Sequence, residues 1–311
     1  MANHALSRPP LSPAGTGTLL GVAAYVLWGV LPLYLKLLQN VPTAQVVAHR
    51  VLWSVVMLVG IVLLFRRVRA ILGAVTMRTV LMLTASAFLI AVNWLVYIWA
   101  VQNAHVLDAS LGYFINPLVN VALGVAVLGE RVRRIQWVAI GLAGAGVLVM
   151  ALSNGGSIWI SLVLALSFGT YGLIRKVVAI DALGGLLIET VLLAPFALGL
   201  LLVAHHGGEG AFGRETATDL LLVVAGAVTA APLLLFAGAA RRMPYAALGL
   251  LQYIAPTLQF LIAIFVFGEH LRPHDLAAFA LIWVGLAVYG SDSVRASRAA
   301  ARDIELEPVT R

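Results

Sequence analysis

Ionisable side chains stand inside long apolar stretches of this sequence, where little water can solvate a charge. Arg50 and His49 lie in the first half of the stretch at 44–65, and Glu189 lies in the stretch at 183–204. Charged groups in hydrocarbon are costly, so they usually pair, face a cavity or bind a ligand. Arg50 stays charged in any protein setting, and therefore needs an anionic partner, a water-filled cavity or an anionic substrate. A structural tie to backbone carbonyls at the outer helix ends explains Arg50 equally well.

Two of these side chains, His49 and Glu189, could exchange a proton near neutral pH. If the protein uses a proton gradient, Glu189 is the first candidate proton carrier and His49 the second. Glu189 could instead form an ion pair with Arg175 or Lys176. Lys36 is a candidate ligand for a solute, or it simply extends to the lipid headgroups.

Polar side chains surround a proline in each of two apolar stretches, with the i, i+3 or i+7 spacing of one helical stripe. They are Tyr113, Asn116 and Asn120 around Pro117, and Gln252 and Gln259 around Pro256. A proline inside a helix frees a backbone carbonyl and bends the helix, so Pro32, Pro117 and Pro256 are candidate hinges. The amides could line a cavity or hold helices together. Their recurrence favours a shared central cavity.

Aromatic side chains extend this candidate cavity. Trp and Tyr are enriched at the headgroup levels of a membrane, but Trp28, Asn93 and Tyr97 lie close to the middle of their stretches and fit that level poorly. Tyr34 and Tyr171 are candidates for the same cavity. Aromatic rings and amides together suit a flat or amphipathic organic solute rather than a bare ion.

The composition is that of a membrane protein. Of the 311 residues, 62% are hydrophobic and 11% are charged, and the mean hydropathy is +1.01, whereas soluble domains carry about 25% charged residues. The sequence has no cysteine, which excludes disulfides and thiolate sites. The net charge of +7 comes from basic residues that flank apolar stretches, which indicates contact with lipid headgroups rather than with nucleic acid.

The sequence contains no GxxxxGK[ST] nucleotide-binding motif, no HExxH pair, no nucleophile elbow and no acidic metal cluster. We therefore expect no cofactor, no metal and no enzymatic activity. The energy source would then be a gradient, either of the solute or of a coupled ion.

Ten stretches are long enough to cross about 30 Å of hydrocarbon, which takes about 20 apolar residues. They are 19–38, 44–65, 79–101, 107–128, 136–152, 158–176, 183–204, 217–240, 246–267 and 276–291. The 20 basic residues concentrate in alternate loops, and those on the other side are Lys36, Arg50, Arg214 and Arg272. The positive-inside rule places both termini in the cytoplasm.

An internal repeat at an offset of about 140 residues divides the chain into two halves. Pro117, Gly129, Glu130 and Arg133 align with Pro256, Gly268, Glu269 and Arg272. Each half would contain five spans, an odd number, so the second half would be inverted, as in transporters that work by alternating access. A duplication that only enlarged the bundle is the alternative. The expected units are an N-terminal tail at 1–16, repeats at 17–152 and 157–291, and a C-terminal tail at 292–311.

Several segments resemble the drug/metabolite transporter superfamily, and within it the RarD-like branch of EamA-type permeases, which is named for chloramphenicol sensitivity. They are AYVLWGVLPLYLK, AHRVLWS, NWLVYIWAVQNAHVLDASLGYFINPLVN and GERVRRIQWVAIGLAGAGVLV. The resemblance covers residues 17–291 and implies a permease of the bacterial inner membrane that moves small metabolites or amphipathic drugs outward. A ligand sensor or assembly subunit on the same fold is the alternative. Proton coupling and a homodimer are further hypotheses.

Overall fold

The computed structural model describes residues 13–102, 106–154 and 158–266, and beyond them 276–277, 280–285, 287–292 and 295. Within these ranges the chain is helical and contains no strand, which confirms the expected all-helical class. The helices are α1 (Pro13–Leu37), α2 (Thr43–Leu64), α3 (Val68–Ala74), α4 (Met77–Gln102), α5 (Val106–Ala126), α6 (Arg134–Asn154), α7 (Ile158–Val177), α8 (Ala182–His206), α9 (Thr216–Ala240), α10 (Tyr245–Leu251) and α11 (Ile254–Phe265). Gly268, Glu269 and Arg272 lie outside the described residues, as do residues 1–12 and most of the expected tail at 292–311.

Six of the described helices are long and apolar enough to cross a membrane, and each coincides with an expected stretch. They are Ala14–Leu37, Thr43–Leu64, Met77–Tyr97, Ile158–Val177, Ala182–His206 and Thr216–Ala240. Shorter apolar helices occur at Gly112–Ala126 and Arg134–Val149, within α5 and α6. The stretch expected at 276–291 is described only in part, so the count of ten spans stays a prediction.

The stretch expected as one helix at 246–267 consists of two, α10 and α11, which meet at Gln252 and Tyr253. The reason is Pro256, which has no amide hydrogen and whose ring clashes with the carbonyl four residues earlier, that of Gln252. Ala255 N donates to that carbonyl instead, at 3.2 Å, so the chain tightens to i→i+3 hydrogen bonds at the joint. Pro256 therefore lies in the first turn of α11, while Pro32 and Pro117 lie inside continuous helices.

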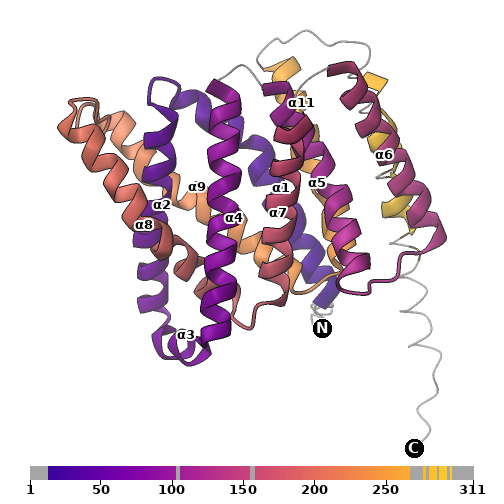
Figure 1. Ribbon diagram of the computed structural model, residues 1–311, viewed down its shortest axis with the longest axis horizontal. Coiled ribbons are helices and arrows are strands. Elements are labelled where there is room, and N and C mark those ends of the chain that lie inside the picture. Colours follow the sequence, from indigo (N-terminus) through magenta and orange to yellow (C-terminus); the bar gives the residue numbers. More distant parts are fainter. Residues whose placement is uncertain are drawn as a thin grey trace, which may run out of the picture.

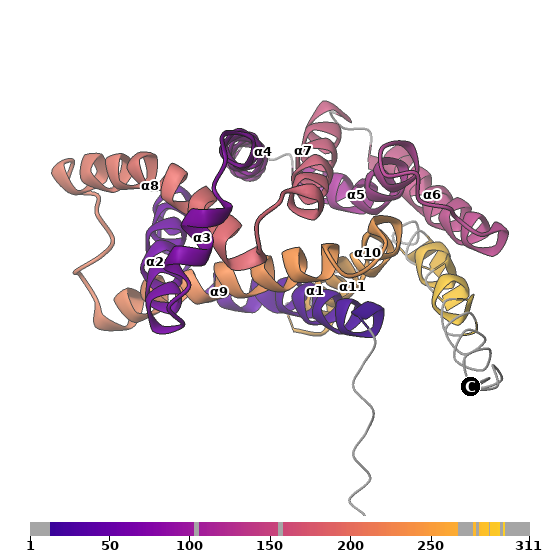
Figure 2. The ribbon, with the colours of Figure 1, turned by 90° about the horizontal axis from the view of Figure 1, so that it is seen from below.

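Two rows of helices pack against each other, as the view in Figure 2 shows. One row contains α4, α7, α5 and α6, and the other contains α2, α9, α1 and α11. Within the rows, α7 packs between α4 and α5, and α9 packs between α2 and α1. At one edge α8 joins the rows through its contacts with α2 and α4, and at the other edge α10 packs on α5.

One end of the molecule carries α3 and the turns that join α7 to α8 and α9 to α10; it is the lower end in Figure 1. We call it the basic end, because its turns and helix termini contain Arg66, Arg67, Arg69, Arg131, Arg133, Arg134, Arg241 and Arg242. Arg67 forms an ion pair with Asp181, and Arg241 Nη1 donates to the carbonyl of Val178 at 3.2 Å. The basic end is therefore tied together across helices from both halves of the chain.

Glu130 makes the strongest of these ties. Its Oε1 accepts from the backbone N–H of Tyr245 at 2.6 Å and its Oε2 from that of Ala246 at 2.9 Å, at the start of α10. Lys176 Nζ lies 3.6 Å from Glu130 Oε1 and donates to the carbonyl of Met243 at 2.7 Å. A carboxylate at a helix start satisfies amides that have no partner within the helix.

We expect Glu130→Gln to lower the free energy of unfolding by about 1–2 kcal/mol, because the amide replaces one of the two acceptors and removes the charge that faces Lys176. Thermal unfolding of the purified protein in detergent measures the change. Glu209→Gln is the matched control, since Glu209 is exposed in the loop between α8 and α9. Equal stability of the two variants would contradict this role of Glu130.

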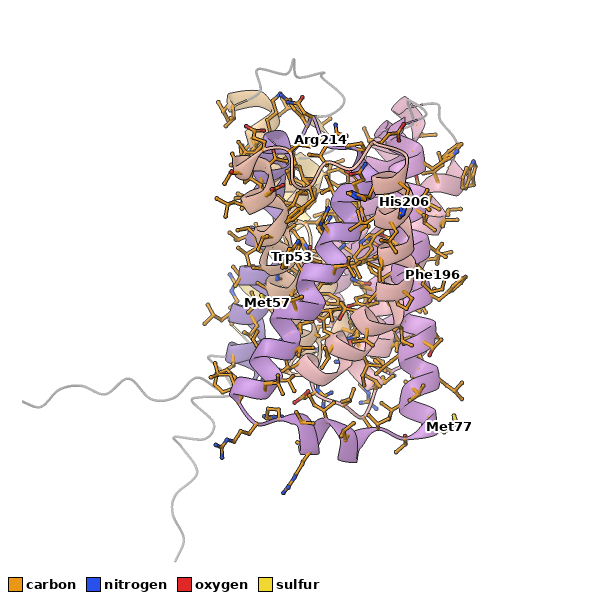
Figure 3. All side chains as sticks on the ribbon, turned by 90° about the vertical axis from the view of Figure 1, so that its left-hand side faces the viewer. Trp53, Met57, Met77, Phe196, His206 and Arg214 are labelled. Carbon is orange, nitrogen blue, oxygen red and sulfur yellow. The ribbon has the colours of Figure 1, made fainter. Side chains whose placement is uncertain are left out.

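Large apolar side chains cover the outside of the helices. Phe196 on α8 is 77% exposed and points away from the bundle in Figure 3, with His206 and Arg214 toward one end of the molecule and Met77 toward the other. Such a surface is stable in lipid and not in water. The same outward face explains why hydropathy alone locates these helices.

Candidate functional site

Arg50 lies between the two rows of helices, in contact with side chains from both. Its Nε donates to Thr229 Oγ1 on α9 at 2.7 Å, and its guanidinium carbon lies 5.7 Å from the centre of the Trp94 ring on α4. It also interacts electrostatically with the phenol groups of Tyr34, Tyr97 and Tyr113, on α1, α4 and α5. We call Arg50, Tyr34, Trp94, Tyr97, Tyr113 and Thr229 the Arg50 cage.

The cage is partly accessible although it lies inside the helix arrangement. Arg50 and its four aromatic neighbours are neither fully buried nor fully exposed. Tyr97 and Tyr113 meet edge to face, with ring centres 5.7 Å apart, and Tyr34 donates from its hydroxyl to the carbonyl of Leu221 at 2.8 Å. The aromatic walls are therefore held in place by contacts of their own.

The position of Thr229 depends on a close approach of α2 and α9. A Cβ atom added at Gly226 would lie 2.5 Å from the carbonyl carbon of Trp53, so only glycine fits there. Ser54 Oγ donates to the carbonyls of Arg50 at 2.6 Å and of Gly226 at 3.1 Å. One helical turn beyond Gly226, Thr229 thus comes within reach of Arg50.

Nearer the basic end, an aromatic layer fills the space between α1, α7 and α9. It consists of Tyr25, Trp28, Phe168, Tyr171 and Phe236. The ring of Trp28 lies 5.8 Å from those of both Phe168 and Phe236. Phe236 follows Thr229 by about 10 Å along α9, at 1.5 Å per residue. The aromatic layer therefore lies between the Arg50 cage and the basic end.

The amide side chains make different contacts, and all of them are buried except Gln259, which is partly buried. Asn120 Nδ2 donates to Gln252 Oε1 at 3.0 Å, which joins α5 to the joint between α10 and α11. Gln259 Nε2 donates to the carbonyl of Trp28 at 3.1 Å, and Asn93 Nδ2 to that of Leu164 at 3.0 Å. Asn116 differs: it is 0% exposed, and neither of its side-chain polar atoms has a hydrogen-bond partner in the part of the chain that the structure describes.

Glu189 forms an ion pair with Arg175. Such a pair, with Arg175 or Lys176, was the alternative to a role of Glu189 as proton carrier. Arg175 Nη1 lies 3.5 Å from Glu189 Oε1, and the two side chains are 1% and 2% exposed. Ser86 Oγ donates to the same oxygen at 2.5 Å, and Arg175 Nη2 donates to the carbonyl of Ala182 at 2.9 Å. The pair joins α7, α8 and α4 in a buried polar cluster.

His49 and Lys36 are not among the residues that make up the Arg50 cage. The ring of His49 stacks on Phe212 in the loop between α8 and α9, with ring centres 5.3 Å apart. Gln45 fixes the same loop, because its side chain donates to the carbonyl of Glu209 and accepts from Ala211 N, both at 2.8 Å. Lys36 lies in the last turn of α1, where it is engaged in an interaction of its own.

The structure adds residues that the sequence did not single out. Thr229 and Ser86 hold Arg50 and Glu189, and Phe168 and Phe236 complete the aromatic layer. Thr229 is the lone polar residue in LLLVVAGAVTAAPLLLF, which was a usable signal. The sequence gives no such signal for Phe168 and Phe236, because an apolar ring in an apolar stretch can face either lipid or the protein interior.

Known proteins with similar sequences cover nearly the whole chain. Residues 15–152 match the model of the EamA-like transporter family. A Pseudomonas aeruginosa protein named as an uncharacterized transporter is 49% identical over 292 residues, which are 91% of this chain and 95% of that protein. The protein RarD of Escherichia coli K12 is 45% identical over 284 residues, 91% of this chain and 96% of RarD.

A solved crystal structure shares the fold, with a TM-score of 0.69 over 90% of this chain and 98% of that one, at 20% identity. The relatives are similar over almost their full length, and the expected resemblance to RarD-like proteins is confirmed. Together with the apolar helices, these matches show that the chain is a multi-pass protein of the bacterial inner membrane and belongs to the EamA-like transporter family.

Proposed function

We propose that the chain is a secondary-active permease that exports small organic solutes by alternating access, and that it leaves the solute chemically unchanged. The observation that carries this proposal is the Arg50 cage, a partly accessible polar site between two rows of helices. In this proposal the aromatic layer and the ties of the basic end would close the route from the cage in one direction, and their position between the cage and the basic end supports this. A site that opens to one side at a time is what alternating access requires.

We also propose that residues 17–152 and 157–291 are inverted five-helix repeats. The packing pattern supports this, because α1 packs on α9 as α7 packs on α4. Likewise α5 packs on α7 as α10 and α11 pack on α1. The pair α2 and α8 and the pair α5 and α10 would lie across the axis that relates the halves. Such a pattern is expected for two halves related by a pseudo-twofold axis, the arrangement that alternating access uses.

The basic end is, in this proposal, the cytoplasmic end, and both termini lie on that side. The concentration of arginines in its turns supports the assignment through the positive-inside rule. The opposite end carries Lys36 and Arg214 among the described residues. The cage would then be closed toward the cytoplasm in the conformation described here.

Solute exchange in proteoliposomes tests the permease proposal. Liposomes with and without the purified protein are loaded with neutral, anionic and cationic aromatic solutes and assayed for exchange against the labelled compound. We expect saturable exchange of at least one solute, which is recovered unchanged. A solute that binds the folded protein without exchange would instead identify a sensor or assembly subunit, and the absence of both binding and exchange would overturn the proposal.

A further inference from the structure

Arg50 is a cation in the membrane interior without an acidic partner among the residues that the structure describes. Among the described residues no carboxylate lies within ion-pairing distance of it, and its neighbours are the hydroxyl of Thr229 and the aromatic groups of the cage. Phenol groups and a π face stabilise a cation less than a carboxylate does. The cage therefore keeps a positive charge that remains unneutralised.

In the second half of the chain, the buried charge of Glu189 has a partner of opposite charge. In the expected repeat, the position that corresponds to Arg50 is that of Glu189, and there the charge is neutralised by Arg175 from the same half. A buried charge is tolerated when it is paired, and an unpaired one is usually functional. Arg50 thus has no counterpart of this pair among the described residues, which favours an anionic ligand as its partner.

The guanidinium also presents its binding edge. Its Nε donates to Thr229, whereas its two Nη nitrogens have no hydrogen-bond partner among the described residues, and the Arg50 side chain is only partly buried. Two parallel N–H groups suit the two oxygens of a carboxylate. Because a single positive charge is present, a monoanion is neutralised, whereas the dianion of a phosphate monoester would leave a negative charge in the interior.

The surroundings indicate what the rest of the solute looks like. Trp94, Tyr97 and Tyr113 form aromatic walls on two helices beside the guanidinium. Asn116 lies one turn further along α5 than Tyr113, on the same helical face, and its buried amide has no hydrogen-bond partner among the described residues. Buried amides usually form hydrogen bonds, so the side chain of Asn116 has a donor and an acceptor available for a solute.

We propose that the solute is a small organic monocarboxylate with an aromatic body, bound through its carboxylate to Arg50. The rings of the cage hold the aromatic body, and Asn116 hydrogen-bonds a polar group of the solute that lies deeper. This inference rests on the permease function and names the solute class of that same site.

Binding of matched compounds to the wild-type protein tests the solute class. Phenylacetate, phenylacetamide and phenyl phosphate share a ring and differ in charge. We expect phenylacetate to bind at least tenfold more tightly than the other two in equilibrium binding to the detergent-purified protein. Equal or weaker binding of phenylacetate than of the amide would overturn the inference, and tighter binding of phenyl phosphate would overturn the choice of a carboxylate.

Substitutions at Arg50 test whether this residue binds the carboxylate. Arg50→Gln should abolish the preference for phenylacetate over phenylacetamide, and Arg50→Lys should retain part of it, because it keeps the charge and loses the fork. Arg69→Gln, at the exposed basic end, is the control and should keep the full preference. An undiminished preference in Arg50→Gln would place the anion elsewhere. If only neutral or cationic solutes exchange in the proteoliposomes, the permease function stands and this inference fails.

Discussion

Glu189→Gln is expected to lower the free energy of unfolding by about 3–5 kcal/mol, the usual cost of removing one partner of a buried ion pair. The substitution keeps the shape of the side chain and leaves Arg175, which is 1% exposed, without its counter-charge. Arg175 could not relax into solvent, because Nη2 is bound to the carbonyl of Ala182 and a Cβ at Gly185 would already lie 1.9 Å from Nη1. Thermal unfolding in detergent measures the loss.

The double variant Arg175→Met/Glu189→Leu distinguishes the loss of the whole ion pair from the cost of leaving one buried charge unpaired. We expect it to be more stable than Glu189→Gln, because apolar replacements of both partners leave no uncompensated charge. Glu209→Gln again serves as the surface control. If Glu189→Gln were as stable as the wild type, the contact with Arg175 would carry little energy, and the ion pair would be incidental.

The same variant addresses proton coupling, which stays a prediction. If Glu189 carries the proton, Glu189→Gln should lose solute accumulation driven by a proton gradient and keep solute exchange, which needs no net proton movement. A purely structural pair predicts that both activities fall together with the folded fraction. The ratio of the two activities in the folded protein therefore decides between the two roles.

Much of the fold could be predicted from the sequence, because each span must be long and apolar to cross hydrocarbon. The joint at Gln252 and Tyr253 was harder to predict from the sequence. Pro256 predicted a bend in the helix. The break into two helices, however, depends on which backbone hydrogen bonds replace the one that Pro256 cannot donate, and here Ala255 N donates to the carbonyl of Gln252. Gln252 consequently lies at the joint, where it bonds Asn120, whereas Gln259 lies within α11, where it bonds the backbone of Trp28.

The site could be predicted only in part, for a physical reason. Hydropathy marks a polar residue in an apolar stretch, and so Arg50, Asn116 and Glu189 stood out. It does not say which helix faces which, and that decides whether a charge is paired. His49 and Arg50 are adjacent in sequence, yet one stacks on Phe212 in a loop and the other faces the interior. The partner Thr229 lies 179 residues from Arg50 along the chain, beyond the reach of any local pattern.

Gly226→Ala is expected to destabilise the protein by about 1–3 kcal/mol, because a single added methyl group would overpack the contact between α2 and α9. The added Cβ would lie 2.5 Å from the carbonyl carbon and 2.7 Å from the carbonyl oxygen of Trp53. These are backbone atoms of a helix, which cannot move aside as the end of a flexible side chain could. The two helices would have to separate.

Gly60→Ala on α2 is the matched control, since a Cβ there has no atom within 4 Å. In a helix that exchange removes the entropic disadvantage of glycine, so the control should be neutral or more stable by about 0.5–1 kcal/mol. Thermal unfolding of both variants in the same detergent measures the difference. Equal behaviour of the two would mean that α2 and α9 do not approach as closely as described.

The consequence of Gly226→Ala should extend from stability to the cage. Ser54 bonds the carbonyls of both Arg50 and Gly226, and Thr229 follows one turn after Gly226. Separation of α2 from α9 would therefore draw Thr229 away from Arg50 Nε and leave the guanidinium free to turn. We expect weaker binding of phenylacetate with little change for phenylacetamide, because only the anion depends on the orientation of the guanidinium. A variant that is destabilised but keeps the full preference for the anion would show that Arg50 is oriented by the aromatic walls and not by Thr229.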